Sequence, residues 1–308
     1  MLDYAALSAL AAVVREGSFE RAAQALHVTP SAVSQRVKLL EQRTGCALVV
    51  RGAPASATDV GRLLCRHAEQ VALLEHSLQA ALPAGARLAH AGVGSEAPQR
   101  PLLRVAVNAD SLATWFIDAM ARFRAVVDDG VLLDLVVDDQ DHTSEWLRRG
   151  EVLAAVTAHA EPVQGCRAIR LGSLAYAATA SPDFMARHFT DGVNATTLRQ
   201  APSLRFSRKD ELQARWVRAV CRRDVELPAH WMPSTRAFVD GGLAGIGWGM
   251  NPLPLVAEHL ASGRLVELVP GRRLSSPLVW QHAALGVPAL GQLGDAVVAA
   301  ARRAGLHP

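Results

Sequence analysis

Segment Ser18–Lys38 constrains the fold of this chain most, because it has the pattern of two short helices joined by a tight turn. Thr29 is a favourable N-cap residue and Pro30 suits the first helical position, so the second helix is predicted to begin at Pro30. At about 100° per residue, one side of this helix is apolar and carries Val33, Val37 and Leu40. The other side is polar, so one face can pack while the other stays free.

The polar side of this helix carries groups that suit DNA recognition in the major groove. They are short hydroxyls, an amide that can make two hydrogen bonds to a base edge, and cations for phosphate or guanine. The candidate DNA-binding residues here and just beyond the helix are Thr29, Ser31, Ser34, Gln35, Arg36, Lys38 and Arg51. An alanine-rich amphipathic pair of helices without any DNA-binding role would give a similar pattern, so this segment alone leaves that alternative open.

A third helix and a hairpin are predicted around the pair. Ser18 can cap the preceding helix, and Glu20 lies in its first turn, where a negative charge suits the helix dipole. An earlier helix follows from the helical spacing of four apolar residues, Leu7, Leu10, Ala11 and Val14. Two short extended pieces flank the turn Gly52–Pro54, which predicts a β-hairpin wing with Arg51 at its tip. Together these patterns predict a small three-helix core with a hairpin wing.

Residues Thr58–Leu82 contain no proline and keep a seven-residue apolar rhythm, which predicts a long dimerisation helix. One heptad position holds Leu64, Val71 and Leu78, and the other holds Val60, His67, Leu74 and Ala81. Such a helix would be roughly 35 Å long. This length is comparable to one turn of DNA, which a dimer of these heads must bridge.

Length and charge favour a two-domain protein with a basic N-terminal part. The 308 residues are half apolar, which is ample for two cores, and the net charge is only +3. Between Ser18 and Arg66, however, seven Lys or Arg residues oppose three Asp or Glu residues. No apolar run of about 18 residues and no signal-peptide pattern is present, so we expect a cytoplasmic protein that does not associate with a membrane.

The four cysteines are widely spaced, so neither a zinc site nor a disulfide framework is predicted, and we expect buried thiols. Enzyme motifs are also missing: the sequence has no G-x-S-x-G, P-loop, H-E-x-x-H or G-x-G-x-x-G run. Segment Gly245–Gly249 is glycine-rich but breaks the last of these spacings, and we interpret it as a closely packed strand. We therefore expect a protein that is not an enzyme.

Beyond a hinge predicted at Pro83–Pro101, the pattern changes to α/β. Apolar runs alternate with helix-like segments, which predicts a parallel sheet covered by helices. The predicted strands are 103–107, 131–137, 152–157, 175–180, 203–206, 245–250, 264–268 and 278–283. The predicted helices are 111–126, 143–149, 211–221, 235–243, 252–260 and 291–304.

Polar residues gather where several predicted strands end, which is where open α/β sheets bind ligands. The candidate effector-binding residues are Asn108, Asp110, Ser111, Asp138, Asp139, Thr157 and Thr235. The group near 108–111 offers N–H groups and a hydroxyl to a carboxylate, and the acidic group near 138–141 offers oxygens to a cation. Together they would suit an amino acid with a basic side chain. Ordinary turn and cap roles remain an alternative for each of them.

A metal site is a weaker interpretation of the same acidic loop. Asp138, Asp139, Asp141 and His142 have suitable residue types, but successive loop residues rarely converge on one ion. We therefore predict no metal and no cofactor beyond a small-molecule effector.

The N-terminal stretch Tyr4–Leu82 resembles LysR-type transcriptional regulators. The residues that carry this resemblance are Phe19, Ala22, Ala23, Leu26, Ser31, Ala32, Val33, Ser34, Gln35, Leu40, Glu41, Gly45, Leu48, Arg51 and Thr58. In the second domain, Val107–Trp115 and Leu147–Glu151 resemble the LysG/ArgP branch of that family.

The resemblance implies a winged helix-turn-helix at 1–58, a linker helix at 59–82, a hinge at 83–101 and an effector domain at 102–308. That domain would be periplasmic-binding-protein-like, with subdomain I at 102–163 and 266–308 and subdomain II at 164–265. The implied partners are double-stranded promoter DNA, lysine or arginine as effector, a second copy in a dimer through the linker helix, a tetramer, and RNA polymerase. The implied function is control of an amino-acid exporter gene.

Related proteins often carry a glutamate where this chain has Arg236, so the resemblance is weaker for effector identity than for effector class. Some members of the branch are described as chromosome-initiation inhibitors. A replication-origin-binding or architectural DNA-binding role without an amino-acid effector is therefore the alternative function.

Overall fold

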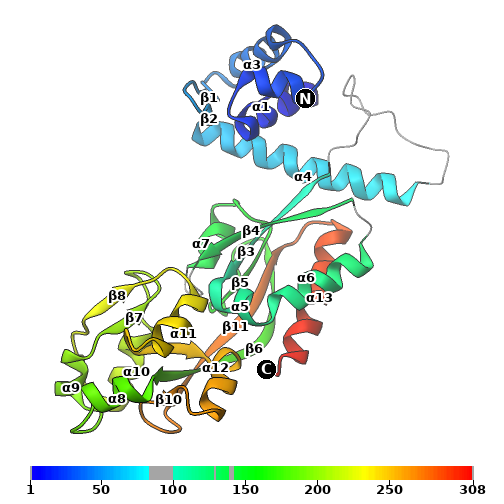
Figure 1. Cartoon of the computed structure of the whole chain (residues 1–308). Coiled ribbons are helices and arrows are strands. Elements are labelled where there is room, and N and C mark those ends of the chain that lie inside the picture. The colour runs from blue at the N-terminus through cyan, green and yellow to red at the C-terminus, as the bar shows by residue number, and fades with distance from the viewer. Residues whose placement is uncertain (1, 83–99, 128–129, 139–141, 307–308) are drawn as a thin grey trace. The chain divides into compact units, whose positions relative to one another are not determined.

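The structure is a computed structural model that describes residues 2–82, 100–127, 130–138 and 142–306 (Figure 1). The chain forms two compact units, one built mainly from the N-terminal helices and the other mainly from a seven-stranded sheet and its helices. The predicted hinge at Pro83–Pro101 lies almost wholly outside the described residues.

The N-terminal head is built on three helices: α1 (Tyr4–Glu16), α2 (Phe19–Ala25) and α3 (Pro30–Thr44). The helix starts predicted at Ser18 and Thr29 are confirmed, because each side-chain oxygen accepts hydrogen bonds from backbone N–H groups of the first turn. All three helices bury apolar side chains in one common core, which includes Leu7, Leu10, Val13, Ala22, Val33, Val37 and Leu40.

The predicted wing is a short hairpin of β1 (Val49–Val50) and β2 (Ser56–Ala57), paired antiparallel. One backbone and one side-chain acceptor hold the wing segment against the helices: Ala55 N–H donates to the Gly17 carbonyl at 2.8 Å, and Leu48 N–H donates to Glu41 Oε1 at 2.9 Å. A Cβ atom on Gly61 would overlap the Leu48 carbonyl oxygen, so the next helix approaches the wing as closely as glycine allows.

That next helix, α4 (Asp59–Ala81), confirms the long helix predicted between Thr58 and Leu82. Thr58 caps it by accepting from Gly61 N–H at 3.1 Å. Several of its large apolar side chains are exposed in this chain: Val60, Leu63, Leu74 and Leu78. Three of these occupy the predicted heptad positions.

The C-terminal unit is organised on a curled sheet of order β10-β6-β11-β5-β3-β4, with β9 also paired to β6. Its strands are β3 (Leu102–Asn108), β4 (Leu132–Asp138), β5 (Ala154–Thr157), β6 (Cys166–Ala180), β9 (Gly249–Pro252), β10 (Val266–Glu267) and β11 (Arg273–Ala283). β3 and β5 run parallel as predicted, but β11 is antiparallel to both β5 and β6. The predicted parallel arrangement therefore holds for β3 and β5 but does not continue through the later strands, because an apolar run indicates a buried strand without fixing its direction.

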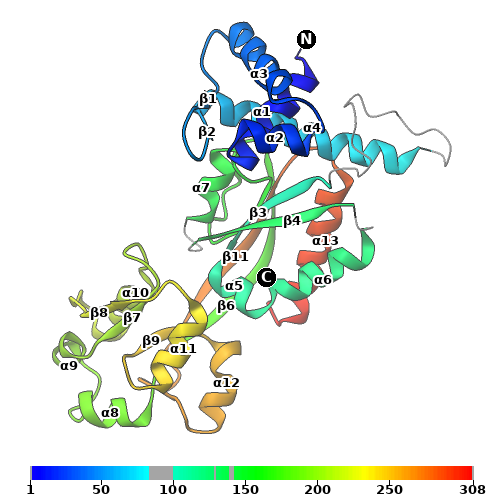
Figure 2. The same ribbon diagram turned by 45° about the horizontal axis from the view of Figure 1, so that its top comes forward.

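The C-terminal unit has two lobes, and the long strands β6 and β11 run from one lobe into the other (Figures 1 and 2). The first lobe contains β3, β4 and β5 with α5 (Ala109–Thr114), α6 (Phe116–Val126), α7 (Thr143–Arg148) and α13 (Pro288–Arg303); α6 and α13 lie side by side. The second lobe contains β9, β10 and the parallel pair β7 (Ser203–Arg205) and β8 (Ala229–Trp231). Its helices are α8 (Pro182–His188), α9 (Ala195–Gln200), α10 (Leu212–Cys221), α11 (Thr235–Leu243) and α12 (Leu253–Ala261).

Strands β6 and β11 connect the lobes. The first half of β11 pairs with the C-terminal half of β6, and its second half pairs with both the N-terminal half of β6 and β5. The register between β6 and β11 shifts at Leu278/Val279, where Leu278 pairs with Gly172 but Val279 pairs with Arg170. Gly172 has a φ of 115°, a conformation that favours glycine.

Several local predictions in this unit were wrong. The single helix predicted at 111–126 is interrupted at Trp115, and α8, α9 and β8 were not predicted. The strand expected at 245–250 begins only at Gly249, because Gly245 has a φ of 67° and follows the end of α11. No helix among the described residues is long and apolar enough to cross a membrane.

The cysteine prediction holds in part. All four thiols are free, but only Cys65 is buried; the others are partly exposed. Burial raises the pKa of the Cys65 thiol to about 12, with a further increase from the nearby charge of Glu69. This thiol therefore remains protonated and has little reactivity at neutral pH.

Candidate functional site

The face of α3 predicted to bind DNA is open to solvent. Val33, Val37 and Leu40 are buried, whereas Ser31, Gln35 and Lys38 are exposed, and Ser34 and Arg36 are half-buried between them. The Thr29 hydroxyl accepts from Ala32 N–H at 3.2 Å, so this side chain is engaged in capping the helix. The packing of the head thus leaves the amide, hydroxyl and cationic groups of α3 available to a DNA groove.

Arg51 follows β1 in the wing and is exposed, as predicted. Its guanidinium carbon lies 5.6 Å from the centre of the Phe19 ring at the start of α2. A cation at this distance is attracted to the face of the ring. The stack positions Arg51 beside the helix-turn-helix and leaves its charge near the solvent.

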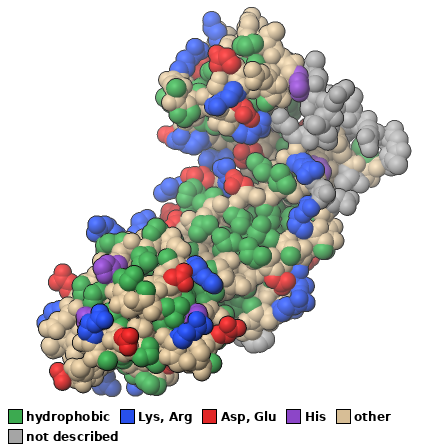
Figure 3. Space-filling view, viewed as in Figure 1, with side chains coloured by type: hydrophobic (Ala, Val, Ile, Leu, Met, Phe, Trp, Pro, Cys, Tyr) green, Lys and Arg blue, Asp and Glu red, His purple; other side chains and the backbone are tan. Residues whose placement is uncertain are grey.

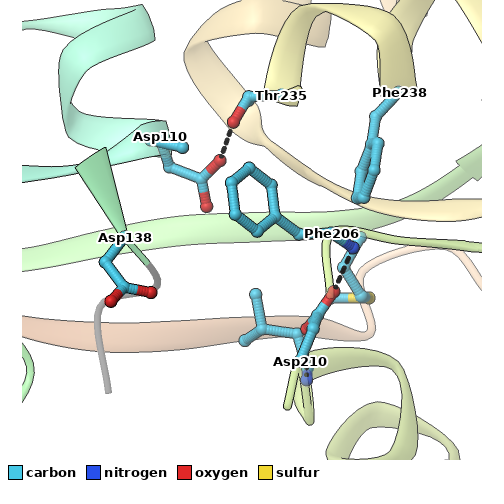
Figure 4. Close-up of a pocket in the computed structure, with 9 residues that line it drawn as sticks. Asp110, Asp138, Phe206, Asp210, Thr235 and Phe238 are labelled. Atoms are coloured by element: carbon cyan, nitrogen blue, oxygen red, sulfur yellow. Dashed lines mark hydrogen bonds between the residues drawn. The ribbon is translucent and has the colours of Figure 1, made fainter. Parts of the chain in front are cut away.

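A second candidate site is a pocket in the C-terminal unit, lined by residues from both lobes (Figure 4). It contains about 340 Å³ of empty space, including the part that is open to solvent. The lining residues are Ala109, Asp110, Asp138, Phe206, Asp210, Leu212, Thr235, Phe238 and Met250. Three are carboxylates and two are phenyl rings, and none of the described lining residues carries a positive charge.

Asp110 joins the two lobes through its carboxyl group. Oδ1 accepts from the Thr235 hydroxyl of α11 at 2.7 Å, and Oδ2 accepts from the Tyr176 hydroxyl of β6 at 2.7 Å (Figure 4 shows the first of these bonds). Burial raises the pKa of Asp110; the two hydroxyl hydrogen bonds oppose this shift, and repulsion from Asp210 adds to it.

The other two pocket carboxylates are held by N–H groups. Asp210 is only 2% exposed, and its Oδ2 and Oδ1 accept from the backbone N–H groups of Phe206 and Leu212, each at 3.0 Å. Asp138, at the end of β4, accepts from the indole Nε1–H of Trp146 at 3.0 Å. These bonds fix the carboxylates at the pocket wall.

The structure places the predicted effector residues in two groups. Asp110, Asp138 and Thr235 line the pocket, so three segments far apart in the sequence meet there. Asn108, Ser111 and Thr157 are fully buried at the ends of β3 and β5 and do not line it. Asp139 lies outside the described residues.

Buried polar atoms without partners lie near these strand ends. Both side-chain polar atoms of Asn108 and the hydroxyls of Ser111 and Ser144 have no hydrogen-bond partner within the described part of the chain. The parallel register of β3 and β5 brings Asn108 and Thr157 to the same edge of the sheet. Buried groups of this kind are normally satisfied by water or a ligand.

Six of the nine residues that line the pocket were not candidates from the sequence: Ala109, Phe206, Asp210, Leu212, Phe238 and Met250. Asp210 could have been found, since it follows a predicted strand and precedes a predicted helix, as other candidates do. The Phe206 and Phe238 rings could not be predicted in the same way, because apolar residues at these positions are equally expected in the hydrophobic core. Arg236 is exposed and does not line the pocket, so its charge does not replace a pocket carboxylate.

No group of three or more His, Cys, Asp or Glu residues in the described ranges could hold a metal ion. Asp139 and Asp141, which belong to the acidic loop considered for such a site, lie outside those ranges.

A winged helix-turn-helix with an open polar face, in one chain with an α/β fold that contains a small-molecule pocket, defines a DNA-binding regulator of the effector-responsive class. Residues 4–62 match the bacterial regulatory helix-turn-helix protein, lysR family, and residues 96–302 match the LysR substrate binding domain. The chain belongs to the LysR family and is a transcriptional regulator of the ArgP/LysG type.

Relatives are similar over nearly the whole chain. The HTH-type transcriptional regulator ArgP of Pseudomonas fluorescens is 45% identical over 97% of this chain and 96% of its own length. The crystal structure of ArgP from Mycobacterium tuberculosis is 44% identical, covers 98% of both chains and has a TM-score of 0.79. Full-length LysG from Corynebacterium glutamicum with bound effector Arg is 36% identical, covers 98% of this chain and 99% of that one, and has a TM-score of 0.69.

Proposed function

We propose that this regulator senses a basic amino acid, lysine or arginine, in the pocket between its lobes and controls transcription of an amino-acid exporter gene. The observation that carries the proposal is the lining of the pocket: three carboxylates and no cation among its described residues. This arrangement favours a positively charged ligand. The similar LysG structure with bound arginine supports the same ligand class.

The pocket offers a distinct surface to each part of such a ligand. The cationic group would lie against Asp110, Asp138 and Asp210, and the aliphatic stem would pack between the Phe206 and Phe238 rings. The unpartnered side chains of Asn108 and Ser111, at the adjoining end of β3, would receive the amino-acid carboxylate and ammonium. The hydroxyl groups of Thr157 and Thr235 would complete the polar surroundings of the ligand.

The DNA-bound form would be a dimer through α4, with Gln35 and Ser34 contacting bases and Lys38, Arg36 and Arg51 contacting phosphates. The exposed Leu74 and Leu78 of α4 support this dimer, since apolar side chains at heptad spacing pack in pairs of helices. Hydrophobic side chains also gather over β4 and α6, Ile117 and Val137 among them, which supports assembly into a tetramer (Figure 3).

Signal transmission would follow the predicted domain organisation, with the head at 1–58, the linker helix at 59–82, the hinge at 83–101 and the effector domain at 102–308. Effector binding would favour one closed arrangement of the two lobes and thereby change the spacing of the paired heads on DNA. The protein would act in the cytoplasm, where the changed spacing would alter transcription by RNA polymerase. A ligand shifts this equilibrium only if it binds one state more tightly than the other.

Calorimetry with the full chain tests the effector. Lysine or arginine should bind, whereas citrulline, which has the shape of arginine but a neutral side chain, should bind at least tenfold more weakly. The Asp110→Ala variant should lose amino-acid binding and keep its DNA affinity. Absence of binding by every basic amino acid would contradict the proposed effector.

Footprinting tests the target. The protein should protect DNA upstream of an exporter gene, and lysine or arginine should change the protected length or the affinity. Protection that never depends on an amino acid would instead support the architectural or replication-origin role.

A further inference from the structure

The three pocket carboxylates differ in the chemistry of their hydrogen-bond partners. Both oxygens of Asp210 accept from backbone N–H groups, and Asp138 accepts from an indole N–H. An N–H group can only donate, so these partners of Asp210 and Asp138 cannot accept a hydrogen bond from a protonated carboxyl group.

Asp110 has hydroxyl partners instead. Tyr176 and Thr235 donate to its two oxygens, and a hydroxyl can reverse its role and accept a proton from a neutral carboxylic acid. Asp110 is thus hydrogen-bonded in both protonation states. This property distinguishes it from Asp210, whose N–H partners can donate to a carboxyl group but cannot accept from one.

The charges that face Asp110 also favour its neutral form. Asp210, on the loop before α10, and Asp138, at the end of β4, line the same pocket, while β6 and α11 contribute the hydroxyls of Tyr176 and Thr235. Cations nearby are directed elsewhere: Arg205 donates to the Asp210 backbone carbonyl and stacks on Trp231, and Arg236 is exposed. Burial and the charge of Asp210 raise the pKa of Asp110.

We propose that Asp110 is protonated in the effector-free protein and that the cation of the bound amino acid displaces this proton. The inference rests on the proposed function, in which a basic amino acid occupies this pocket. The step balances: the carboxylic acid loses one proton to solvent, and the resulting carboxylate pairs with one positive charge of the ligand. Asp110 thereby determines the requirement for a cationic ligand and makes its binding depend on pH.

The sign of the pH dependence follows from this exchange. Each bound amino acid releases up to one proton, so acid opposes binding. Affinity should rise by up to about tenfold per pH unit below the pKa of Asp110 and become constant above it. Arginine is the suitable probe, because its guanidinium stays charged over this range.

Calorimetric titration of the full chain with arginine, between about pH 5 and pH 8, tests the inference. Titrations in two buffers of different ionisation enthalpy give the number of protons released. We expect proton release and the rising affinity in the native protein. The Asp110→Asn variant, which keeps a neutral hydrogen-bonding group, should bind arginine at least tenfold more weakly, with no proton release and no dependence on pH.

The Asp138→Asn variant is the matched control, since it also removes one carboxylate from the pocket. This variant should still release a proton when arginine binds, and its affinity for arginine should still rise with pH. Loss of both properties in this variant would overturn the assignment of the released proton to Asp110. The thermal unfolding of each variant shows whether the unit that carries the pocket is folded.

Infrared difference spectroscopy of the native protein provides a readout without any variant. Arginine should abolish the carbonyl stretch of one protonated carboxyl group. Binding of arginine with neither proton release nor this spectral change would overturn the inference alone. Failure of arginine and lysine to bind at any pH would instead count against the proposed function.

Discussion

Gln35 and Lys38 lie on the same exposed face of α3, but their side chains would act on DNA through different chemistry. An amide can make two directed hydrogen bonds to a base edge, whereas an ammonium group attracts any phosphate. The first would contribute to sequence discrimination and the second to affinity for all DNA. Substitutions at the two positions should therefore have separable effects.

Replacing Gln35 by alanine should reduce discrimination between the target sequence and other sequences by about 1–3 kcal/mol, because the bidentate contact to a base is lost. Competition binding with the target duplex and a scrambled duplex measures this difference. The affinity for scrambled DNA should change little. An equal loss on both duplexes would mean that Gln35 does not contact a base.

Replacing Lys38 by alanine should weaken binding to all sequences and reduce the slope of log affinity against log salt by about one, because one phosphate contact is lost. Titrations over a range of salt concentrations measure the slope. An unchanged slope would show that Lys38 does not neutralise a phosphate.

At the residue scale, the sequence indicated only some of the side chains that line the pocket. Asp110, Asp138 and Thr235 were predicted for the pocket and line it. Tyr176 was not predicted, because it lies in the middle of an apolar strand and its hydroxyl meets a carboxyl 66 residues away. Only the folded chain brings that pair together.

At the scale of elements, helix starts could be predicted because capping is local. The Thr29 side chain and the N–H group that it accepts from are three residues apart, and Pro30 follows directly. Strand direction and the interruption at Trp115 could not be predicted, since they depend on packing against distant segments. The apolar pattern of 111–126 is compatible with one helix as well as with two.

Replacing Thr29 by alanine should destabilise the start of α3 by about 1 kcal/mol, because the N–H of Ala32 loses its hydrogen-bond acceptor. Hydrogen exchange of the first α3 amides in the full chain measures this loss. The Thr29→Ser variant keeps the capping oxygen and should exchange almost as slowly as the native protein. Fast exchange in the serine variant would contradict a capping role.

At the scale of the whole molecule, the two halves of the chain differed in how much the sequence could predict. The head is built from neighbouring helices, so its core and its open face follow from local periodicity. The pocket is built from segments that include residues 110, 138, 210 and 235, and no local sequence pattern indicates that these segments come together. Its lining was therefore predicted only in part.

The exposed apolar side of α4 leads to a prediction about assembly. Replacing Leu74 and Leu78 by glutamate should dissociate the dimer, because two buried charges would face each other across the helix pair. Sedimentation measures the mass, and binding to paired half-sites should weaken at least tenfold. The Glu75→Gln variant, at an exposed polar position of the same helix, should remain dimeric. A dimer that survives the double substitution would place the interface elsewhere.

The shifted register at Leu278/Val279 has a mechanical consequence. A bulge increases the local twist of a strand pair and interrupts its regular hydrogen bonding. The two paired strands that join the lobes therefore resist sliding along their length but yield more readily to torsion at this point. If an occupant of the pocket turns one lobe relative to the other, the paired strands would twist most easily at this irregular point, next to Gly172.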